Sequence, residues 1–409
     1  MKISLRKVRQ NLLYFGVLLI LVMFTDTLWI RNISGNRFYI VIGIGIVVAL
    51  WTLWHCKKTD IVKIAYFVVP IILSMMVNFD FNTLLFFRIA LILICWGLMK
   101  KTDMNRLMNN YISFMVFIAM FSLICMIFRS SIVSMSIIPT IDSGTYGTKA
   151  LFFTNVKIGT GNLYFLRNQG PFWEPGAYQA YLNIALMFLL FGDFKRKNKP
   201  IDILILIIAV ISTISTTGYL VLGLLILAKM VTRENTSLLS KVSIASLLVV
   251  IVIVAVNNET INYLLFDKMS SSSANNISNA TRLYSILQNG KGIMQNPLFG
   301  ISPSKYSKLF SESHSVLGAV STGVNTTTSL SVWALYGVVF FFVYNAGIMY
   351  FVKFFKEKFM STLLLIVALF VIFNTENMNY SLFFTLIPFW GFYRKGGGSF
   401  EGGSNNNRV

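Results

Sequence analysis

The sequence predicts an all-α polytopic membrane protein. Hydrophobic residues make up 56% of the 409-residue chain and charged residues only 12%, and the mean hydropathy is +0.69. Apolar runs of about 18 to 22 residues recur along the chain, which is the length that an α-helix needs to cross the hydrocarbon layer. Helices satisfy all their backbone polar groups internally, as lipid requires. A soluble globular fold is therefore excluded.

The apolar runs predict about twelve helical spans in a single transmembrane domain, residues 1–393. The remaining segment, 394–409, is rich in Gly, Ser and Asn and is expected to be a disordered cytoplasmic tail. The expected spans are Asn11–Ile30, Tyr39–Trp54, Ile61–Asn78, Leu84–Leu98, Tyr111–Phe128, Tyr178–Phe191, Ile201–Thr213, Tyr219–Met230, Val242–Val256, Thr328–Tyr350, Met360–Phe373 and Leu382–Phe392.

Basic residues sort to one side of these spans. The first ten residues hold four Lys and Arg, and if the spans alternate in direction the same side receives HCKKTD, MKKTDMNR, DFKRKNKP, KMVTREN, VKFFKEKF and FYRK. Cytoplasmic loops carry the excess of Lys and Arg. Both termini are therefore predicted to be cytoplasmic. The net charge of +20 is first a sign of topology, and no nucleic-acid partner is expected.

The opposite face receives mostly short turns and two long loops, roughly Arg129–Ala177 and Asn257–Thr327. Turn-forming residues fill the first loop, which ends in RNQGPFWEPGAY. The second contains NATRLYSILQNGKGIMQ, whose apolar residues recur near helical spacing and stop at Asn296-Pro297. This pattern predicts a helix lying along the membrane surface, with Arg282 in its first turn. Function is expected in these two loops.

The segment RNQGPFWEPGAY has the composition of a built site. Arg167 and Glu174 flank two aromatic residues, and Gly170-Pro171 and Pro175-Gly176 restrict the backbone on either side. A surface ion pair between the two charges would contribute little to stability. Charged groups at membrane depth usually serve a site, which favours the functional interpretation. Glu174 also directly precedes a predicted helix, where it would interact favourably with the helix dipole.

Two further residues have competing interpretations. Arg88 lies about one turn inside the fourth span, where it either extends to the outer interface or lines the site cavity as a cation. His314, in SESHSVLG, is either structural or a proton-transfer group.

Several motifs of other enzyme classes are missing from the sequence. It has no glycine-rich phosphate loop, no Cys/His metal cluster, no Asp-x-Asp element and no Gly-x-Ser-x-Gly elbow. We therefore expect neither a metal nor a cofactor. Apart from Arg88 the predicted spans carry almost no charge, which disfavours a transporter.

Three segments resemble the family of bacterial O-antigen polymerases and ligases. RNQGPFWEPGAYQAYLNIAL resembles that family's Arg-x-x-Gly-x-Phe-x-Glu-Pro-Gly element, and RLYSILQNGKGIMQNPLFGISPSKY is similar to its Arg, Asn-Pro-Leu-Phe-Gly and Tyr element. HSVLGAVSTGVNTTTSLSVWALYGVVF resembles the segment that returns to the next helix. The resemblance implies a GT-C-like fold and an inverting, metal-independent glycosyltransferase. It would join oligosaccharide units carried on undecaprenyl diphosphate into O-antigen or a similar surface polysaccharide.

Residue chemistry agrees with this reaction. Guanidinium groups bind diphosphate oxygens in two-pronged fashion, for which Arg167, Arg282 and Arg88 are candidates. The acceptor hydroxyl needs a base, which Glu174 or His314 would supply. Side chains that would bind or stack on sugars, or else pack at the loop bases, are Asn168, Gln169, Trp173, Tyr178 and Tyr306.

The resemblance also implies a setting. The enzyme would lie in the bacterial inner membrane, with its active site facing the periplasm, among membrane lipids and beside a chain-length regulator and a flippase. Two alternatives stay open: an O-antigen ligase that transfers glycan to lipid A-core, and a flippase or transporter of the lipid-linked oligosaccharide. The Glu-Pro-Gly element favours the polymerase.

Overall fold

The computed structural model describes residues 15–19, 21–22, 26–29, 36–53, 58–142, 147–159, 166–194, 196–232, 276–311, 315–316, 319–320 and 325–393. Within these ranges the chain is mostly helical, and ten of the twelve predicted spans correspond to helices. The span predicted at Asn11–Ile30 is described only in part. The span predicted at Val242–Val256 and the predicted tail, 394–409, lie outside the described residues.

Most helices that match predicted spans begin and end within a few residues of the expected positions, but α6 begins at Met104, seven residues before the predicted Tyr111. Side-chain caps explain two of the starts: Asn82 accepts a hydrogen bond from the N–H of Leu84, and Asp103 accepts one from that of Asn105. These helices are α3 (Asn36–Leu53), α4 (Lys58–Asn78), α5 (Thr83–Lys101), α6 (Met104–Ile127), α8 (Pro175–Phe191), α9 (Lys199–Ser212), α10 (Thr216–Thr232), α15 (Thr328–Lys353), α16 (Phe359–Phe373) and α17 (Leu382–Tyr393).

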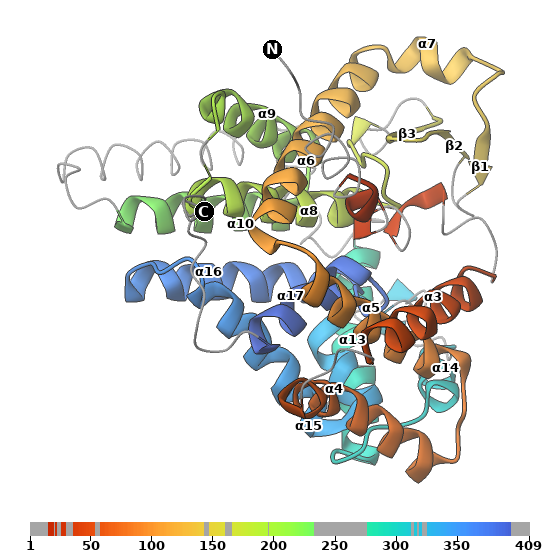
Figure 1. Cartoon of the computed structure of the whole chain (residues 1–409). Helices are drawn as coiled ribbons and strands as arrows, with labels where there is room; N and C mark the ends of the chain where they lie inside the picture. The colour runs from red at the N-terminus through yellow and green to blue at the C-terminus, as the bar shows by residue number, and fades with distance from the viewer. Residues whose placement is uncertain are drawn as a thin grey trace, which may run out of the picture.

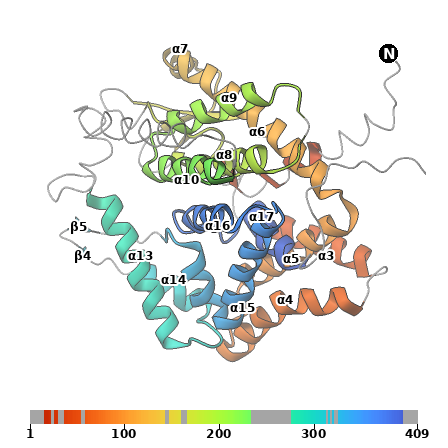
Figure 2. The ribbon, with the colours of Figure 1, turned by 90° about the vertical axis from the view of Figure 1, so that its left-hand side faces the viewer.

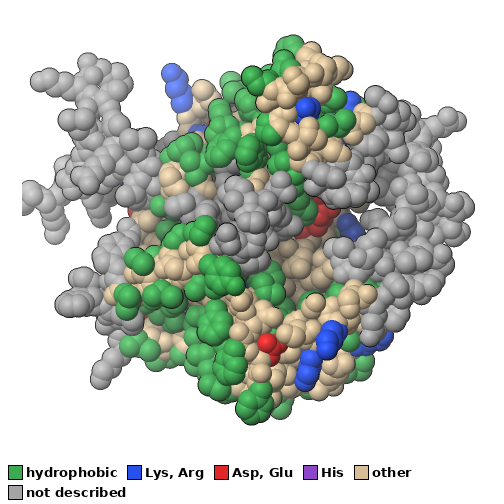
Figure 3. All heavy atoms as spheres, turned by 90° about the vertical axis from the view of Figure 1, so that its right-hand side faces the viewer, with side chains coloured by type: hydrophobic (Ala, Val, Ile, Leu, Met, Phe, Trp, Pro, Cys, Tyr) green, Lys and Arg blue, Asp and Glu red, His purple; other side chains and the backbone are tan. Residues whose placement is uncertain are grey.

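Four helices of the described part are long and apolar enough to cross a membrane: α4, α5, α6 and α15. Shorter apolar helices accompany them, including α8, α10, α16 and α17. Large apolar side chains stay exposed on the outer helices, for example Tyr39, Val47 and Leu50 of α3. Figure 3 shows many hydrophobic side chains on the described part of one face, with a few charged side chains among them. Exposed apolar surface on this scale is typical of a membrane-embedded helical protein.

The helices form two layers (Figure 1). Helices α6, α8, α9 and α10 pack together in one layer, whereas α3, α4, α5, α15 and α17 pack in the other. Helix α16 contacts both α10 and α15 and so joins the layers, as the turned view in Figure 2 also shows.

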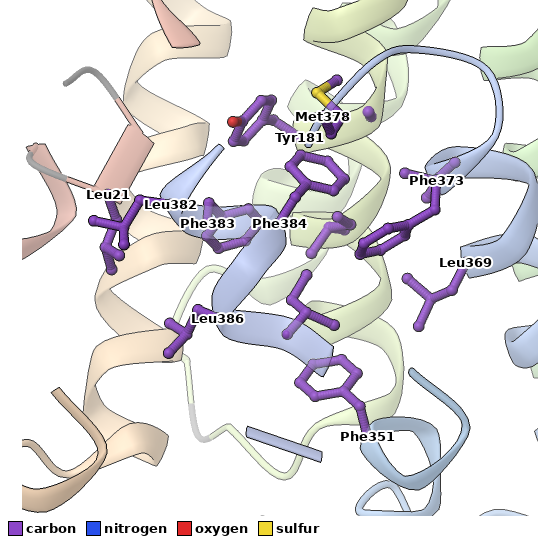
Figure 4. Packing of buried hydrophobic residues seen from close by; sticks show 14 of the residues in the cluster. Leu21, Tyr181, Phe351, Leu369, Phe373, Met378, Leu382, Phe383, Phe384 and Leu386 are labelled. Atoms are coloured by element: carbon purple, nitrogen blue, oxygen red, sulfur yellow. The ribbon is translucent and has the colours of Figure 1, made fainter. Parts of the chain in front are cut away.

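Helix α8 lies at the centre of the molecule. Nearly all of its residues are buried, as expected for a helix that is apolar all round and surrounded by other helices. The ring of Tyr181 lies between Phe172 and Phe383, with ring centroids 4.3 and 5.3 Å away. Figure 4 shows this aromatic packing between α8 and α17. The fold therefore fixes the start of α8 firmly.

The first long loop contains secondary structure that the sequence analysis did not predict. Helix α7 (Arg129–Ser134) is followed by β1 (Thr140–Asp142), β2 (Gly147–Leu151) and β3 (Thr154–Lys157). The strands form an antiparallel sheet in the order β1-β2-β3. All four residues of β3 are buried. The described part of this loop is therefore packed secondary structure rather than a set of turns.

The second long loop contains the predicted helix, α13 (Asn276–Gln295), which stops at Asn296-Pro297 as expected. The described part of this loop adds α14 (Pro303–Ser311), which was not predicted, and a two-stranded sheet of β4 (Ser315–Val316) and β5 (Ala319–Val320). Helix α13 packs on α15.

Helix α15 is broken at Gly337, whose φ is +82°. The Asn296–Gly300 turn occupies the break: the carbonyl of Pro297 accepts from the N–H of Val338 at 3.0 Å, and that of Ala334 accepts from the N–H of Ile301 at 2.7 Å. Non-helical backbone at membrane depth is tolerated when protein groups satisfy it in this way. The segments NPLFG and LYG, which are far apart in the sequence, therefore form one interlocked unit.

Candidate functional site

The candidate site is built on the segment from Arg167 to Gly176, which leads into α8. Strand β3 holds this segment, because the N–H of Asn155 donates to the carbonyl of Gly170 at 2.7 Å and its side-chain amide donates to the carbonyl of Phe172 at 3.2 Å. Gly170 has a φ of +51°, and a side chain there would collide with the ring of Tyr178. The segment therefore has a defined conformation that depends on this glycine.

Glu174 is the N-cap residue of α8, but its side chain makes no capping hydrogen bond. Its Oε1 instead accepts from the indole Nε1 of Trp173 at 2.7 Å. Pro175 occupies the first helical position, where a missing N–H costs nothing. The sequence analysis correctly placed Glu174 at a helix start, and the structure adds that its carboxylate accepts a hydrogen bond from Trp173 instead of capping the helix.

The candidate site includes two cations, Arg167 and Lys157. The Nε of Arg167 donates to the carbonyl of Thr213 at 3.2 Å, in the turn between α9 and α10. Lys157 ends β3 with only 1% of its surface exposed, and its strand end is fixed by Arg129, which donates to its carbonyl at 3.0 Å. Both Arg167 and Glu174 act electrostatically on the Lys157 ammonium group.

Burial lowers the pKa of Lys157 to about 7, with a further lowering from the Arg167 charge and an opposing effect from Glu174. A lysine that is both buried and next to another cation is costly to keep charged in water-excluded surroundings. Strongly shifted side chains of this kind concentrate at functional sites. Lys157 is therefore part of the candidate site, although the sequence analysis did not select it.

Gln169 shows a second feature of a binding site. Its side chain is 1% exposed, and within the described part of the chain neither its Nε2 nor its Oε1 has a hydrogen-bond partner. Buried amide groups are normally satisfied, so an orphan pair of donor and acceptor calls for a water molecule or a ligand. The role of Gln169 in binding sugar hydroxyls stays a prediction.

The other residues predicted from this segment have internal partners. The side-chain amide of Asn168 donates to the hydroxyls of Ser122 and Ser212, both at 3.0 Å. The hydroxyl of Tyr178 lies 3.0 Å from that of Ser122, and its ring stacks on Phe172. Trp173 is half-buried and packs against the apolar cluster of Leu28, Ile141 and Ala150. These contacts position the segment.

An acidic residue from a distant turn completes this end of α8. Residues 374–381, here called the 374–381 turn, connect α16 to α17, and the Glu376 carboxylate of this turn lies directly against Gly176. Glu376 is largely buried. The sequence analysis placed this stretch among the short turns of the face opposite the basic loops and did not select Glu376, because no local pattern marks it.

The 374–381 turn also contacts a second buried carboxylate and the buried arginine. The hydroxyls of Ser381 and Tyr181 both donate to Oδ2 of Asp26. The Nη1 of Arg88 donates to the carbonyl of Asn379. The turn is thus the structural link between the start of α8 and the interior of the other helical layer.

Arg88 does not extend to an interface. Its side chain is completely buried, its Nη1 also donates to Thr385 Oγ1 at 2.8 Å, and its guanidinium lies 5.5 Å from the ring of Phe340 and 5.6 Å from that of Tyr344. The interpretation that Arg88 extends to the outer membrane interface is therefore wrong. Whether Arg88 serves a substrate stays a prediction.

The residues predicted from the second loop form a separate group. Tyr306 is half-buried, and its hydroxyl donates to Asn289 Oδ1 at 2.8 Å. Loss of solvent around this hydroxyl raises its pKa. Asn289 in turn donates to Asn325 and Thr327, both at 3.0 Å. Arg282 lies half-buried in the second turn of α13, which begins at Asn276, and not in the first turn as predicted. His314 lies outside the described residues.

The site contains no obvious metal centre: among the described residues, no three His, Cys, Asp or Glu side chains are grouped so that they would hold a metal ion. Compared with protein-family models, curated proteins and solved structures, the chain has no significant match.

Proposed function

We propose that this protein is a membrane glycosyltransferase that polymerises oligosaccharide units carried on undecaprenyl diphosphate, as in O-antigen synthesis. The observation that carries the proposal is the grouping of Lys157, Arg167 and Glu174 at the start of the buried helix α8. Two fixed cations and a carboxylate are the groups that transfer from a sugar diphosphate requires when no metal takes part.

The cations would stabilise the leaving group. When the bond between the anomeric carbon and the diphosphate oxygen breaks, the electron pair goes to that oxygen and negative charge grows on the diphosphate. Arg167 offers a planar donor fork for phosphate oxygens, and Lys157 adds a point charge in a buried setting where electrostatic interactions are strong. In this proposal Arg282 also binds the diphosphate. Arg88 acts on the diphosphate indirectly, because it holds the 374–381 turn.

Glu174 would act as the base. The acceptor hydroxyl oxygen attacks the anomeric carbon, its proton passes to the Glu174 carboxylate, and the new glycosidic bond forms as the diphosphate leaves. A single displacement of this kind inverts the anomeric centre. His314 is the alternative base, and Gln169, with its unsatisfied amide, is the described residue best suited to hold a sugar hydroxyl.

The remaining parts of the proposal concern the setting. We assign the protein to the bacterial inner membrane with both termini in the cytoplasm, on the basis of the basic loops. The start of α8 then faces the periplasm, where a flippase would deliver the lipid-linked units and a chain-length regulator would act on the product.

The test is reconstitution of the purified protein in liposomes with lipid-linked repeat units, lipid A-core as a possible acceptor, and excess chelator. We expect lengthened glycan on the same carrier. If the protein instead transfers the glycan to lipid A-core without lengthening it, the protein is a ligase and not a polymerase. In cells, deletion of the gene should leave lipopolysaccharide with a single repeat unit, whereas unsubstituted core with accumulated lipid-linked polymer would indicate a ligase.

Two observations favour a transporter as the second candidate. Helix α15 is broken at Gly337, and the buried Arg88 lies against the rings of Phe340 and Tyr344 on the same helix. Broken helices and buried cations are features of transport sites. In the same liposomes, a transporter would move lipid-linked units across the bilayer without lengthening them.

A further inference from the structure

The side chain of Glu376 packs against the first turn of α8, 200 positions away in the sequence. A Cβ added to Gly176 would lie 3.1 Å from the carboxyl carbon of Glu376 and would overlap its Oε1. The absence of a side chain at Gly176 is therefore what allows the carboxylate to approach. This contact gives the glycine of the Glu-Pro-Gly element a specific role.

The main chain around Glu376 is held in place by α15. The hydroxyl of Thr328 donates to the carbonyl of Glu376 at 2.7 Å and accepts from the N–H of Met378 at 2.9 Å. Asn374, at the start of the turn, accepts from the N–H of Ser329 at 3.2 Å. The carboxylate therefore reaches α8 from a fixed support.

The start of α8 has backbone N–H groups that such an anion would serve. The first intrahelical bond runs from the N–H of Tyr178 to the carbonyl of Glu174, so the N–H groups of Gly176 and Ala177 have no partner within the helix. The N-cap side chain would normally serve them, but that of Glu174 is turned to Trp173. A carboxylate at this place is also favoured by the helix dipole.

We propose that Glu376 caps α8 in place of Glu174 and thereby keeps the Glu174 carboxylate available to the site. Glu376 is then a positioning residue that acts through Glu174. The kinetic part of this inference rests on the proposed function, whereas its structural part does not.

The structural part is tested by hydrogen exchange on the full-length protein. In Glu376→Ala, the amides at the start of α8 should exchange faster than in the wild type, because their cap is lost. Glu357→Ala is the matched control, since Glu357 accepts from Thr232 at 2.6 Å elsewhere in the structure; it should leave these amides unchanged. If these amides exchange at the same rate in Glu376→Ala as in the wild type, the proposal is wrong.

The kinetic part is tested by a double-mutant cycle in the polymerisation assay. Glu376→Ala should lower kcat at least tenfold with little change in KM, and Glu376→Gln, which keeps a capping oxygen, should lose much less. In a Glu174→Gln background, Glu376→Ala should cause no further loss, because both changes act on one group. Additive losses would overturn the positioning role by showing that Glu376 acts on the substrate directly.

The two proposals fail in different ways. If the wild-type protein does not lengthen glycan but Glu376→Ala still accelerates exchange at α8, the proposed function is wrong and the capping role stands. If the protein is an active polymerase and exchange is unchanged, the capping role is wrong and the proposed function stands.

Discussion

The N–H of Val338 donates to the carbonyl of Pro297 at 3.0 Å, so a turn from the second long loop completes the broken helix α15. Gly337 makes this possible, since its φ is +82° and a Cβ there would overlap the carbonyl of Leu298. The two segments therefore depend on each other.

Gly337→Ala should destabilise the protein by about 2 kcal/mol or more, because it adds both left-handed backbone strain and a collision. The measurement is the apparent Tm in detergent. Gly223→Ala in α10 is the control: a Cβ there meets nothing within 4 Å, and alanine is the better helix former. Equal melting of the two variants would show that the break in α15 does not need glycine.

Lys157→Met should leave stability unchanged or raise it while lowering polymerisation about tenfold or more, because burying the lysine is costly and its charge serves the site. The pKa of Lys157 is about 7 in the folded protein, against an ordinary value of 10.5. Between these pH values the unfolded chain binds more protons, so this group makes wild-type stability rise with pH.

Melting temperatures from pH 7 to pH 9 check this prediction, since Lys157→Met should lack that rise. Arg167 and Glu174, which act on Lys157, are present in both proteins. A variant that is both less stable and fully active would make Lys157 a structural residue only.

Arg167→Lys and Arg282→Lys should each impair polymerisation strongly, because an ammonium group lacks the two-pronged donor geometry of a guanidinium. Rates on purified variants of matched Tm are the measurement. Arg196→Lys is the control, since Arg196 pairs with Asp202 at 2.7 Å on the predicted cytoplasmic side and should retain its rate. Full activity in Arg167→Lys would remove it from diphosphate binding.

Glu174→Gln should lower the rate of glycan extension about a thousandfold, to a residual but measurable value, while substrate still binds, because the amide keeps the volume of the carboxylate but cannot accept the proton. His314→Ala should be the milder change. Extension rates and substrate affinity are compared on both variants at matched expression. The reverse ranking would make His314 the base, and near-normal activity in both would place the site elsewhere.

A cysteine at Ser304 should react with a membrane-impermeant thiol reagent in outer-permeabilised cells, and one at Lys197 should not. Both residues are exposed, so the difference reports sidedness rather than burial. The background carries alanine at Cys56, Cys95 and Cys125. Labelling at Lys197 with protection at Ser304 would invert the predicted orientation.

Local patterns in the sequence determined most of the helices. The apolar runs predicted ten described helices, and the spacing of Leu283, Ile286 and Leu287 predicted α13, because helical hydrogen bonds join residues only four apart. The composition likewise predicted a membrane-embedded protein. Arg167 and Glu174 stood out because glycine, proline and charge are concentrated in one short segment.

Tertiary packing decided what that segment meets. Nothing around Lys157 in the sequence distinguishes it from an exposed strand lysine, and Glu376 lies in what looks like a simple turn; each acquires its surroundings only when β3 and the 374–381 turn pack against the start of α8. The break in α15 likewise requires a partner turn to satisfy its backbone. Such contacts join residues up to 200 positions apart, and their free energies depend on the packing of whole helices rather than on any local pattern.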